Sequence, residues 1–202
     1  TVMTGNRLFL VRHGPTHAKG MVGWSDLPAD LGDRAALDRL SAHLPGEALV
    51  VSSDLVRCTG TADAIQRGRP RLPHDRNLRE IHFGDWELRR FDEIEAEDPE
   101  RITAFWSEPG LVRPPNGESW HEMRARADAA VDRLARAHPG ADLVIVAHFG
   151  MILGQLERAL QVPTTEIFGQ RIDNLSVTEL TRLDRGEAAE PGWQVGRVNY
   201  RP

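Results

Sequence analysis

The sequence predicts an α/β protein whose mainly parallel central sheet is covered by helices on both faces. Three short apolar runs rich in Val, Leu and Ile are each bounded by polar residues or by Gly and Pro, as is typical of buried strands. Segments with the apolar spacing of helices lie between and after these runs. Strands that alternate with helices favour a parallel sheet between two helical layers.

The predicted core strands cover residues 7–11, 47–51 and 142–147. They are short and almost continuously apolar, as the buried strands of a parallel sheet usually are. Two later runs, 172–180 and 193–198, also resemble strands, and we expect them near an edge of the sheet.

Five segments have the apolar periodicity of helices that pack one side against a core. They span residues 33–43, 55–67, 91–106, 119–138 and 151–160, with a break in the third near Pro99. The pair Pro114 and Pro115 predicts a loop over 110–117, because proline stops a helix. With 202 residues the chain is long enough to bury one full core, so we expect a single domain over residues 1–202.

The composition excludes several classes of partner and site. The 25 basic and 30 acidic side chains give a net charge of −5, so there is no overall positive field to hold a nucleic acid or an anionic membrane. The single cysteine, Cys58, excludes an intrachain disulfide and a CxxC metal site. No apolar run reaches the length of a membrane span, and the run 8–11 is too short for the core of a secretory signal. We therefore expect a cytoplasmic protein, whose oligomeric state the sequence leaves open.

Chemically active side chains follow all three predicted core strands. The first strand leads directly into Arg12 and His13. The second leads into Arg57 on the first turn of the next helix, and the third leads into His148. The carboxyl ends of parallel strands meet at one edge of a sheet, where open α/β sheets bind their ligands. A glycine follows each histidine, which allows a tight turn or a close approach of the backbone to an anion.

Two guanidinium groups and two imidazoles at one edge favour a phosphate ligand, because arginine pairs bidentately with phosphate oxygens. A neutral imidazole also has a lone pair that can attack phosphorus, and neighbouring arginines help to keep it neutral. The leaving oxygen then needs a proton, for which the segment 78–87 offers Glu80, Asp85 and Glu87. A bound phosphate raises the pKa of a carboxyl group beside it, as a general acid requires.

The spacing of His13 and His17 would suit a metal ion on a helix, but Gly14 and Pro15 break a helix there. The other histidines are scattered without the spacing of metal ligands. We therefore expect neither a metal ion nor an organic cofactor.

Five motifs identify the chain more specifically. They are LVRHG, SSDLVRCTGTA, LREIHFGDWE, NGES and VAHFG. In this order and spacing they resemble the histidine phosphatase superfamily, also called the phosphoglycerate mutase-like family, over essentially the whole chain. The resemblance implies a three-layer α/β/α sandwich in which His13 is the phosphorylated nucleophile.

The resemblance also implies roles for the residues around this histidine. Arg12, Arg57 and His148 would bind the phosphoryl oxygens and stabilise charge during transfer. Glu80 would protonate the leaving group and later activate water, and the backbone N–H of Phe149 would join the phosphate pocket.

The residues expected around the rest of the substrate depart from the family pattern. Thr16 keeps a hydroxyl, whereas Pro15 removes a backbone donor and Lys19 stands where mutases have a substrate-contacting Asn. Val22 precedes Gly23 at a position where mutases carry Ser or Thr. We expect Thr16, Lys19 and Gly23 to lie at the substrate, with Lys19 able to reach an anionic group away from the reacting phosphate.

Three functions are compatible with these motifs: a phosphatase acting on phosphate monoesters of small molecules, a cofactor-dependent phosphoglycerate mutase, and a pseudo-enzyme that only binds a phosphorylated partner. Residues 92–116 contain seven acidic side chains and two arginines, where the mutases place lysine and paired arginines. Such an acidic cover would repel a bisphosphate. A pseudo-enzyme would have no need of both histidines and Glu80. The sequence therefore predicts the phosphatase and does not identify its substrate.

Overall fold

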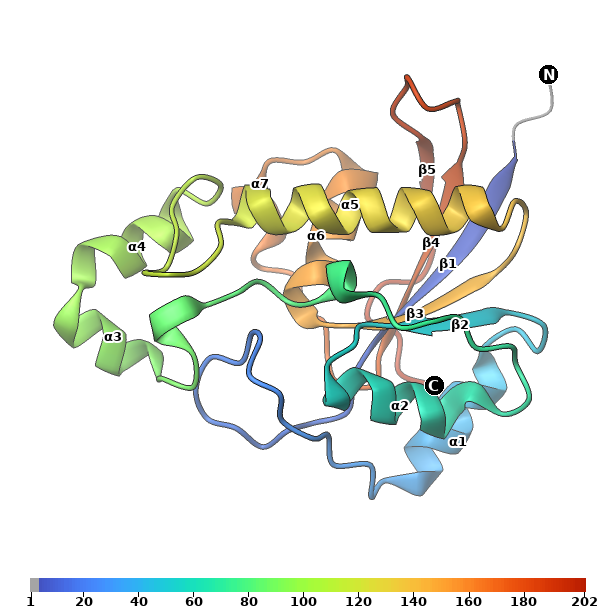
Figure 1. Cartoon of the computed structure of the whole chain (residues 1–202), viewed down its shortest axis with the longest axis horizontal. Helices are drawn as coiled ribbons and strands as arrows, with labels where there is room; N and C mark the ends of the chain where they lie inside the picture. Colours follow the sequence, from blue (N-terminus) through green and yellow to red (C-terminus); the bar gives the residue numbers. More distant parts are fainter. Residues whose placement is uncertain (1–3) are drawn as a thin grey trace.

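The computed structural model describes residues 4–202 and contains a five-stranded sheet (Figure 1). The strands are β1 (Gly5–Arg12), β2 (Leu49–Ser52), β3 (Leu143–Ala147), β4 (Val177–Leu183) and β5 (Gly192–Val195). Their order across the sheet is β2-β3-β1-β4-β5. The three predicted core strands β1, β2 and β3 are parallel, β4 is antiparallel to β1, and β5 is antiparallel to β4. The predicted α/β class with a mainly parallel sheet is confirmed.

Helices cover both faces of the sheet and form a separate core on each face (Figure 1). On one face lie α1 (Arg34–His43) and α2 (Val56–Gln66), and on the other lie α5 (Trp120–Ala137) and α6 (Phe149–Leu160). Alternate residues of a strand point to opposite faces, so Leu8 and Leu10 join the α5/α6 core while Phe9 and Val11 join the α1/α2 core. The alternation explains why these strands are apolar at nearly every position.

The third predicted helix is two helices that meet at the predicted break. α3 (Phe91–Glu97) ends at Asp98, whose side chain accepts the Arg101 N–H and so caps α4 (Pro99–Ser107). Pro99 occupies the first turn of α4, where its missing N–H costs no hydrogen bond. Figure 1 shows α3 and α4 projecting at one end of the molecule. Three short helices were not predicted: α7 (Thr164–Ile167) and two 3-10 turns, Arg76–Leu78 and Gly84–Trp86.

The prediction of a strand over 172–180 is wrong in its first five residues, because β4 begins only at Val177. Leu175 has a φ of 60°, a left-handed conformation that cannot belong to an extended strand. The side chain of Asn174 instead turns toward the first strand and donates to the carbonyl oxygen of His13. The strand predicted over 193–198 likewise ends at Val195, at the edge of the sheet.

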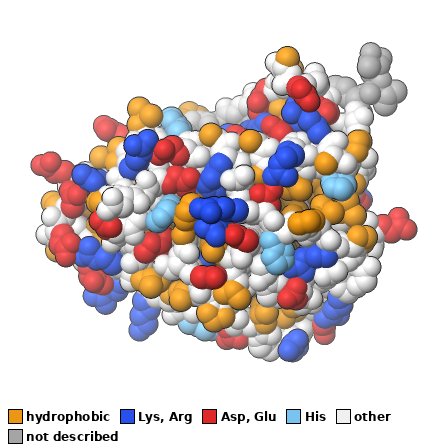
Figure 2. Space-filling view, in the orientation of Figure 1, with side chains coloured by type: hydrophobic (Ala, Val, Ile, Leu, Met, Phe, Trp, Pro, Cys, Tyr) orange, Lys and Arg blue, Asp and Glu red, His pale blue; other side chains and the backbone are white. Residues whose placement is uncertain are grey.

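Within residues 4–202, no helix is both long and apolar enough to cross a bilayer. Acidic and basic side chains are interspersed over the face shown in Figure 2.

Candidate active site

The carboxyl ends of β1, β2 and β3 lie at one edge of the sheet and bring their following residues together. Arg12 is opposite Ala147 in the β1/β3 register, and Ser52 is opposite Val146 in the β2/β3 register. The residues that follow these paired positions, His13, Ser53 and His148, therefore lie side by side. The ring centroids of His13 and His148 are 5.3 Å apart, although the two residues are far apart in the sequence.

The hydrogen bonds of His13 determine which of its two ring nitrogens is unprotonated and keeps a lone pair. Nδ1 lies 2.7 Å from the carbonyl oxygen of Gly14, and Nε of Arg57 lies 3.3 Å from Nε2. Arginine can only donate, so Nε2 is the acceptor and Nδ1 carries the proton. Burial and the two nearby arginines lower the pKa of His13 to about 3. The imidazole is therefore neutral, with its lone pair on Nε2 in the cavity.

Arg57 reaches this histidine from the first turn of α2 and is almost fully buried. Its Nη1 donates to the carbonyl oxygen of Ser25 at 2.7 Å, and its Nη2 donates to that of Gly23 at 2.5 Å. The same loop supplies Asp26, whose carboxylate accepts the N–H of Val56 at 2.7 Å and caps α2. The loop after β1 thus fixes both the helix that carries Arg57 and the guanidinium group itself.

Arg12 lines the cavity from the end of β1. Its Nη1 donates to the carbonyl oxygen of Ile172 at 2.6 Å, and its guanidinium carbon lies 5.4 Å from the centroid of the Phe149 ring. Its Nε is buried without a hydrogen-bond partner within the described residues. Burial lowers the pKa of Arg12, but arginine keeps its charge in proteins. Arg57 therefore places a positive charge at the lone pair of His13, and Arg12 adds a second one near the imidazole.

Glu80 lies in the same cavity with its carboxylate held by two backbone amides. Oε2 accepts the N–H of Gly150 at 2.8 Å, and Oε1 accepts the N–H of Ile81 at 3.0 Å. Burial nevertheless raises the pKa of Glu80, because two N–H groups do not replace bulk water around a carboxylate. A Cβ at Gly150 would lie 2.4 Å from Oε1, so this approach requires glycine.

His148 is fully buried behind His13. Its Nε2 lies 2.9 Å from the Ser53 hydroxyl and 3.4 Å from the Cys58 sulfur. Burial, with Arg57 as the nearest charge, lowers its pKa well below the usual value. Cys58 is buried as well, and burial raises the pKa of its thiol, so it is a packing partner of the histidine and remains un-ionised.

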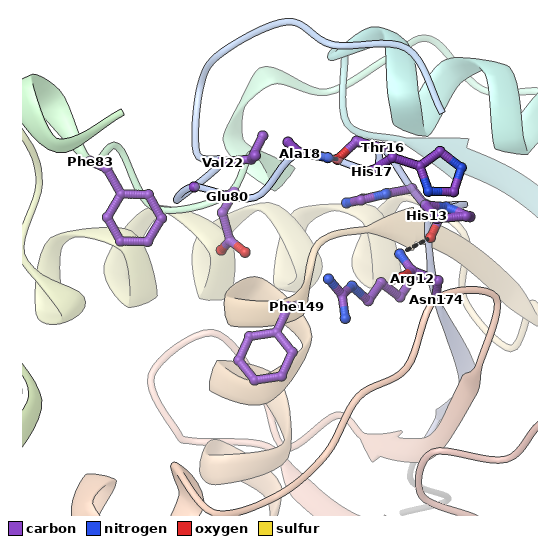
Figure 3. Close-up of a pocket in the computed structure, with 12 residues that line it drawn as sticks. Arg12, His13, Thr16, His17, Ala18, Val22, Glu80, Phe83, Phe149 and Asn174 are labelled. Atoms are coloured by element: carbon purple, nitrogen blue, oxygen red, sulfur yellow. Dashed lines mark hydrogen bonds between the residues drawn. The ribbon is translucent and has the colours of Figure 1, made fainter. Parts of the chain in front are cut away.

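Arg12, His13 and Glu80 open onto a cavity of about 450 Å³, and Arg57 and His148 are buried behind its wall (Figure 3). Its lining includes Arg12, His13, Thr16, Glu80, Phe149 and Asn174. Figure 3 shows the Glu80 carboxylate with the Phe83 ring on one side and with Phe149, Arg12 and His13 on the other. The cavity therefore joins a neutral imidazole nitrogen, positive charge and a protonatable carboxyl group.

Comparison with known proteins identifies the family. Residues 8–194 match the model of the histidine phosphatase superfamily, branch 1. The chain belongs to this superfamily. It is 31% identical over 174 residues to the adenosylcobalamin/alpha-ribazole phosphatase of Salmonella typhimurium, a match that covers 83% of this chain and 86% of the relative. It is also 34% identical over 177 residues to the glucosyl-3-phosphoglycerate phosphatase of Mycobacterium tuberculosis, covering 80% and 78% of the two chains.

The fold is similar to that of solved members of the superfamily. The structure of Bacillus stearothermophilus YhfR superposes with a TM-score of 0.83 at 29% identity, and the match covers 96% of each chain. The architecture is thus the phosphoglycerate mutase-like fold that the motifs implied.

The five residues predicted to be catalytic lie close together in the structure. Some of the residues predicted to bind the substrate do not line the cavity. Thr16 lines the cavity, and Phe149 is the first residue of α6, where its N–H has no intrahelical acceptor. The N–H of Gly23 is bonded to the Glu87 carboxylate at 2.9 Å, and its carbonyl oxygen holds Arg57. Lys19 is exposed and does not line the cavity. Contact of Gly23 and Lys19 with substrate stays a prediction.

Sequence reasoning missed two residues that hold the loop of His13. The amide of Asn174 donates to the carbonyl oxygen of His13 at 2.9 Å, and the hydroxyl of Thr61 accepts the N–H of Gly14 at 3.0 Å. The polar pair Asp173 and Asn174, which interrupts an apolar run, was the available signal for the first. Thr61 lies on a buried helix face and gave no such signal.

The other histidines do not form a cluster with His13 and His148. His17, which the spacing had linked to His13, lies within 2.7 Å of Asp30 and also lines the rim of the cavity. Within residues 4–202, no group of three or more His, Cys, Asp or Glu side chains is close enough together to hold a metal ion.

Proposed function

We propose that this protein hydrolyses phosphate monoesters of small molecules through a phosphohistidine on His13. The observation that carries the proposal is the neutral His13, whose Nε2 lone pair faces Arg57 in a cavity shared with Glu80. Two relatives in the superfamily, named above, are called phosphatases and act on phosphorylated small molecules.

In the first step, Nε2 of His13 attacks phosphorus, and the bond between phosphorus and the leaving oxygen breaks. The leaving oxygen takes the proton of Glu80, whose acid form is favoured because burial raises its pKa. The products are a free alcohol, a phosphohistidine and an ionised Glu80.

In the second step, the Glu80 carboxylate takes a proton from a water molecule while the water oxygen attacks phosphorus. The bond between phosphorus and Nε2 breaks, the lone pair returns to His13, and inorganic phosphate leaves. Glu80 is then protonated again, so the cycle restores both groups and needs no cofactor.

The surrounding donors stabilise the charge on the transferring group. Arg12 and Arg57 supply fixed positive charge in a buried site, where it acts more strongly than in water. The N–H of Phe149 at the start of α6 adds a backbone donor, and Thr16 adds a hydroxyl at the cavity wall.

The test is phosphate release from a panel of phosphorylated metabolites and from 4-nitrophenyl phosphate. We expect turnover that vanadate inhibits, because vanadate adopts the five-coordinate geometry of phosphoryl transfer. Chelators should leave the rate unchanged, because arginines fill the electrostatic role that metal ions have in metal-dependent phosphatases. Activity that a chelator abolishes and one metal ion restores would contradict the proposal.

A further inference from the structure

A second, apolar cavity lies directly beside the catalytic one. Its volume is about 60 Å³, and we call it the aromatic chamber, defined by Phe105, Trp106, Trp120, Leu153 and Phe168. The chamber also shares Glu80, Phe83 and Phe149 with the lining of the catalytic cavity. The phenyl rings of Phe83 and Phe149 thus form a wall common to both spaces.

The rings of the chamber pack edge to face. Trp106 and Phe168 have centroids 5.6 Å apart at 70°, and Trp120 and Phe168 have centroids 5.0 Å apart at 81°. Phe105 packs against Trp106 in the same way. Protein interiors seldom leave voids of several carbon atoms between such groups. An unfilled apolar space beside a general acid therefore suits a ligand.

The charges of the site disfavour a second anionic group on that ligand. Among the described residues, only Glu80 is ionisable and lines the chamber, and both its oxygens already accept backbone N–H groups. Of the lysines and arginines in residues 4–202, only Arg12 lines the catalytic cavity, and the phosphoryl group needs it. The part of the substrate on the chamber side thus meets aromatic rings and one carboxyl group, and among the described residues no lysine, arginine or histidine lines the chamber to pair a carboxylate or a second phosphate.

The chemistry places the leaving group on the chamber side. Phosphoryl transfer to His13 is in line, so the leaving oxygen departs on the face of phosphorus opposite Nε2. That oxygen must also reach Glu80 to take its proton. Figure 3 shows Phe83 on the side of Glu80 away from His13, and Glu80 and Phe83 both also line the aromatic chamber. The carbon chain of the leaving alcohol therefore passes Glu80 toward the aromatic chamber.

We propose that the aromatic chamber binds the apolar end of the leaving alcohol, a branched alkyl chain or the edge of an aryl ring. This inference rests on the proposed hydrolase activity and assigns its substrate class: uncharged, apolar alcohols esterified to a single phosphate. The volume admits only a few carbon atoms, so the selected feature is a short apolar group close to the ester oxygen.

The test compares two phosphate esters of primary alcohols, 3-methylbutyl phosphate and 2-hydroxyethyl phosphate. The hydroxyl group makes the second alcohol the better leaving group, so any preference for the first reflects binding of its carbon chain. We expect kcat/KM to be about tenfold higher, or more, for 3-methylbutyl phosphate, since filling an apolar pocket by one or a few methylenes gives discrimination of that order.

Trp106 is the variant position, because it lies at the end of α4 with 39% of its surface exposed and tolerates change better than the buried rings. Trp106→Ala should reduce the ratio of the two kcat/KM values toward one, and Trp106→Phe should retain most of it. Leu111→Ala is the matched control, an exposed apolar residue nearby that lines neither cavity, and it should leave the ratio unchanged.

The possible outcomes distinguish the proposed hydrolase activity from the proposed role of the aromatic chamber in substrate binding. Hydrolysis of both esters at equal kcat/KM, with inhibition by vanadate, would overturn the chamber's role and leave the hydrolase in place. A folded Trp106→Ala variant that still prefers 3-methylbutyl phosphate to the same degree would also overturn the chamber's role and leave the hydrolase in place. Absence of phosphate release from both esters and from 4-nitrophenyl phosphate would overturn the hydrolase and the chamber's role with it.

Discussion

Burial shifts the pKa values of the two reacting residues in opposite directions and favours the neutral form of each. It lowers the pKa of the His13 imidazole to about 3 and raises the pKa of the Glu80 carboxyl, because in each case the charged form is poorly solvated. A nucleophile must be unprotonated and a general acid protonated at the same pH. One physical cause, removal from water, therefore prepares both groups for the first step.

Glu80 should set the alkaline limit of phosphoryl transfer to the enzyme. Its folded-state pKa is raised by burial, and the acid form is lost as the pH rises through that raised value. The rate of phosphoenzyme formation from an alkyl phosphate, measured by rapid quench, should fall along this limb. His13, with its pKa of about 3, should add no acid limb in the range where enzymes are usually assayed.

Glu80→Gln should remove this limb and slow the transfer from an alkyl ester by roughly a hundredfold to ten-thousandfold. With 4-nitrophenyl phosphate the loss should be much smaller, because that leaving group needs no proton. An equal loss with both esters would show that Glu80 acts by some means other than proton donation.

At the scale of elements, one carboxylate ties the loop after β1 to the segment that carries Glu80. Glu87 accepts the N–H groups of Gly23 and Trp24 at 2.9 and 2.7 Å, and the hydroxyl of Ser25 at 2.8 Å. The carbonyl oxygens of Gly23 and Ser25 in turn hold Arg57. Glu87 is thus a positioning residue for a guanidinium group that it does not touch.

Glu87→Ala should lower kcat/KM by roughly tenfold or more, since each hydrogen bond to a charged group contributes about 1.5–3 kcal/mol. The vanadate dissociation constant should rise in parallel, because Arg57 loses its fixed geometry. Glu87→Gln, which keeps one acceptor oxygen, should restore part of the activity. Asp85→Asn, at an exposed carboxylate two residues away, is the control. Weaker thermal stability with unchanged vanadate binding would reduce Glu87 to a purely structural residue.

The sequence predicted the elements that end at the site better than the loops that complete it. Short apolar runs define β1, β2 and β3, and the rule that parallel strands share a ligand-binding edge places Arg12, His13 and His148 together. Residues 172–176 were mispredicted because an apolar run cannot reveal that Asn174 turns inward to hold His13. Likewise, no spacing rule could show that Gly23 faces Glu87, since that contact joins segments far apart in the chain.

At the scale of the whole molecule, the acidic segment near the cavity distinguishes a phosphatase from a mutase. It forms α3 and α4, and its two arginines are already paired, Arg101 with Asp98 and Arg113 with Glu122. A mutase must retain a bisphosphate and shield its phosphohistidine from water. An acidic segment whose arginines are already paired should instead let the alcohol of a monophosphate leave. Water should then be able to reach the phosphohistidine.

We therefore expect no isomerisation of 3-phosphoglycerate, with or without a 2,3-bisphosphoglycerate primer, and only slow release of phosphate from it. The measurement follows 2-phosphoglycerate and free phosphate together in one reaction. Primer-dependent isomerisation much faster than phosphate release would identify a mutase.

The phosphohistidine itself is the central claim, and trapping it is the most direct test. The enzyme is mixed with an ester carrying radioactive phosphorus and quenched within the first turnover, and the labelled residue is located by peptide mapping. The label should be acid-labile and alkali-stable and should map to His13, while His13→Ala should lose both label and turnover. An acid-stable label on a serine or threonine, or turnover retained by His13→Ala, would contradict the account.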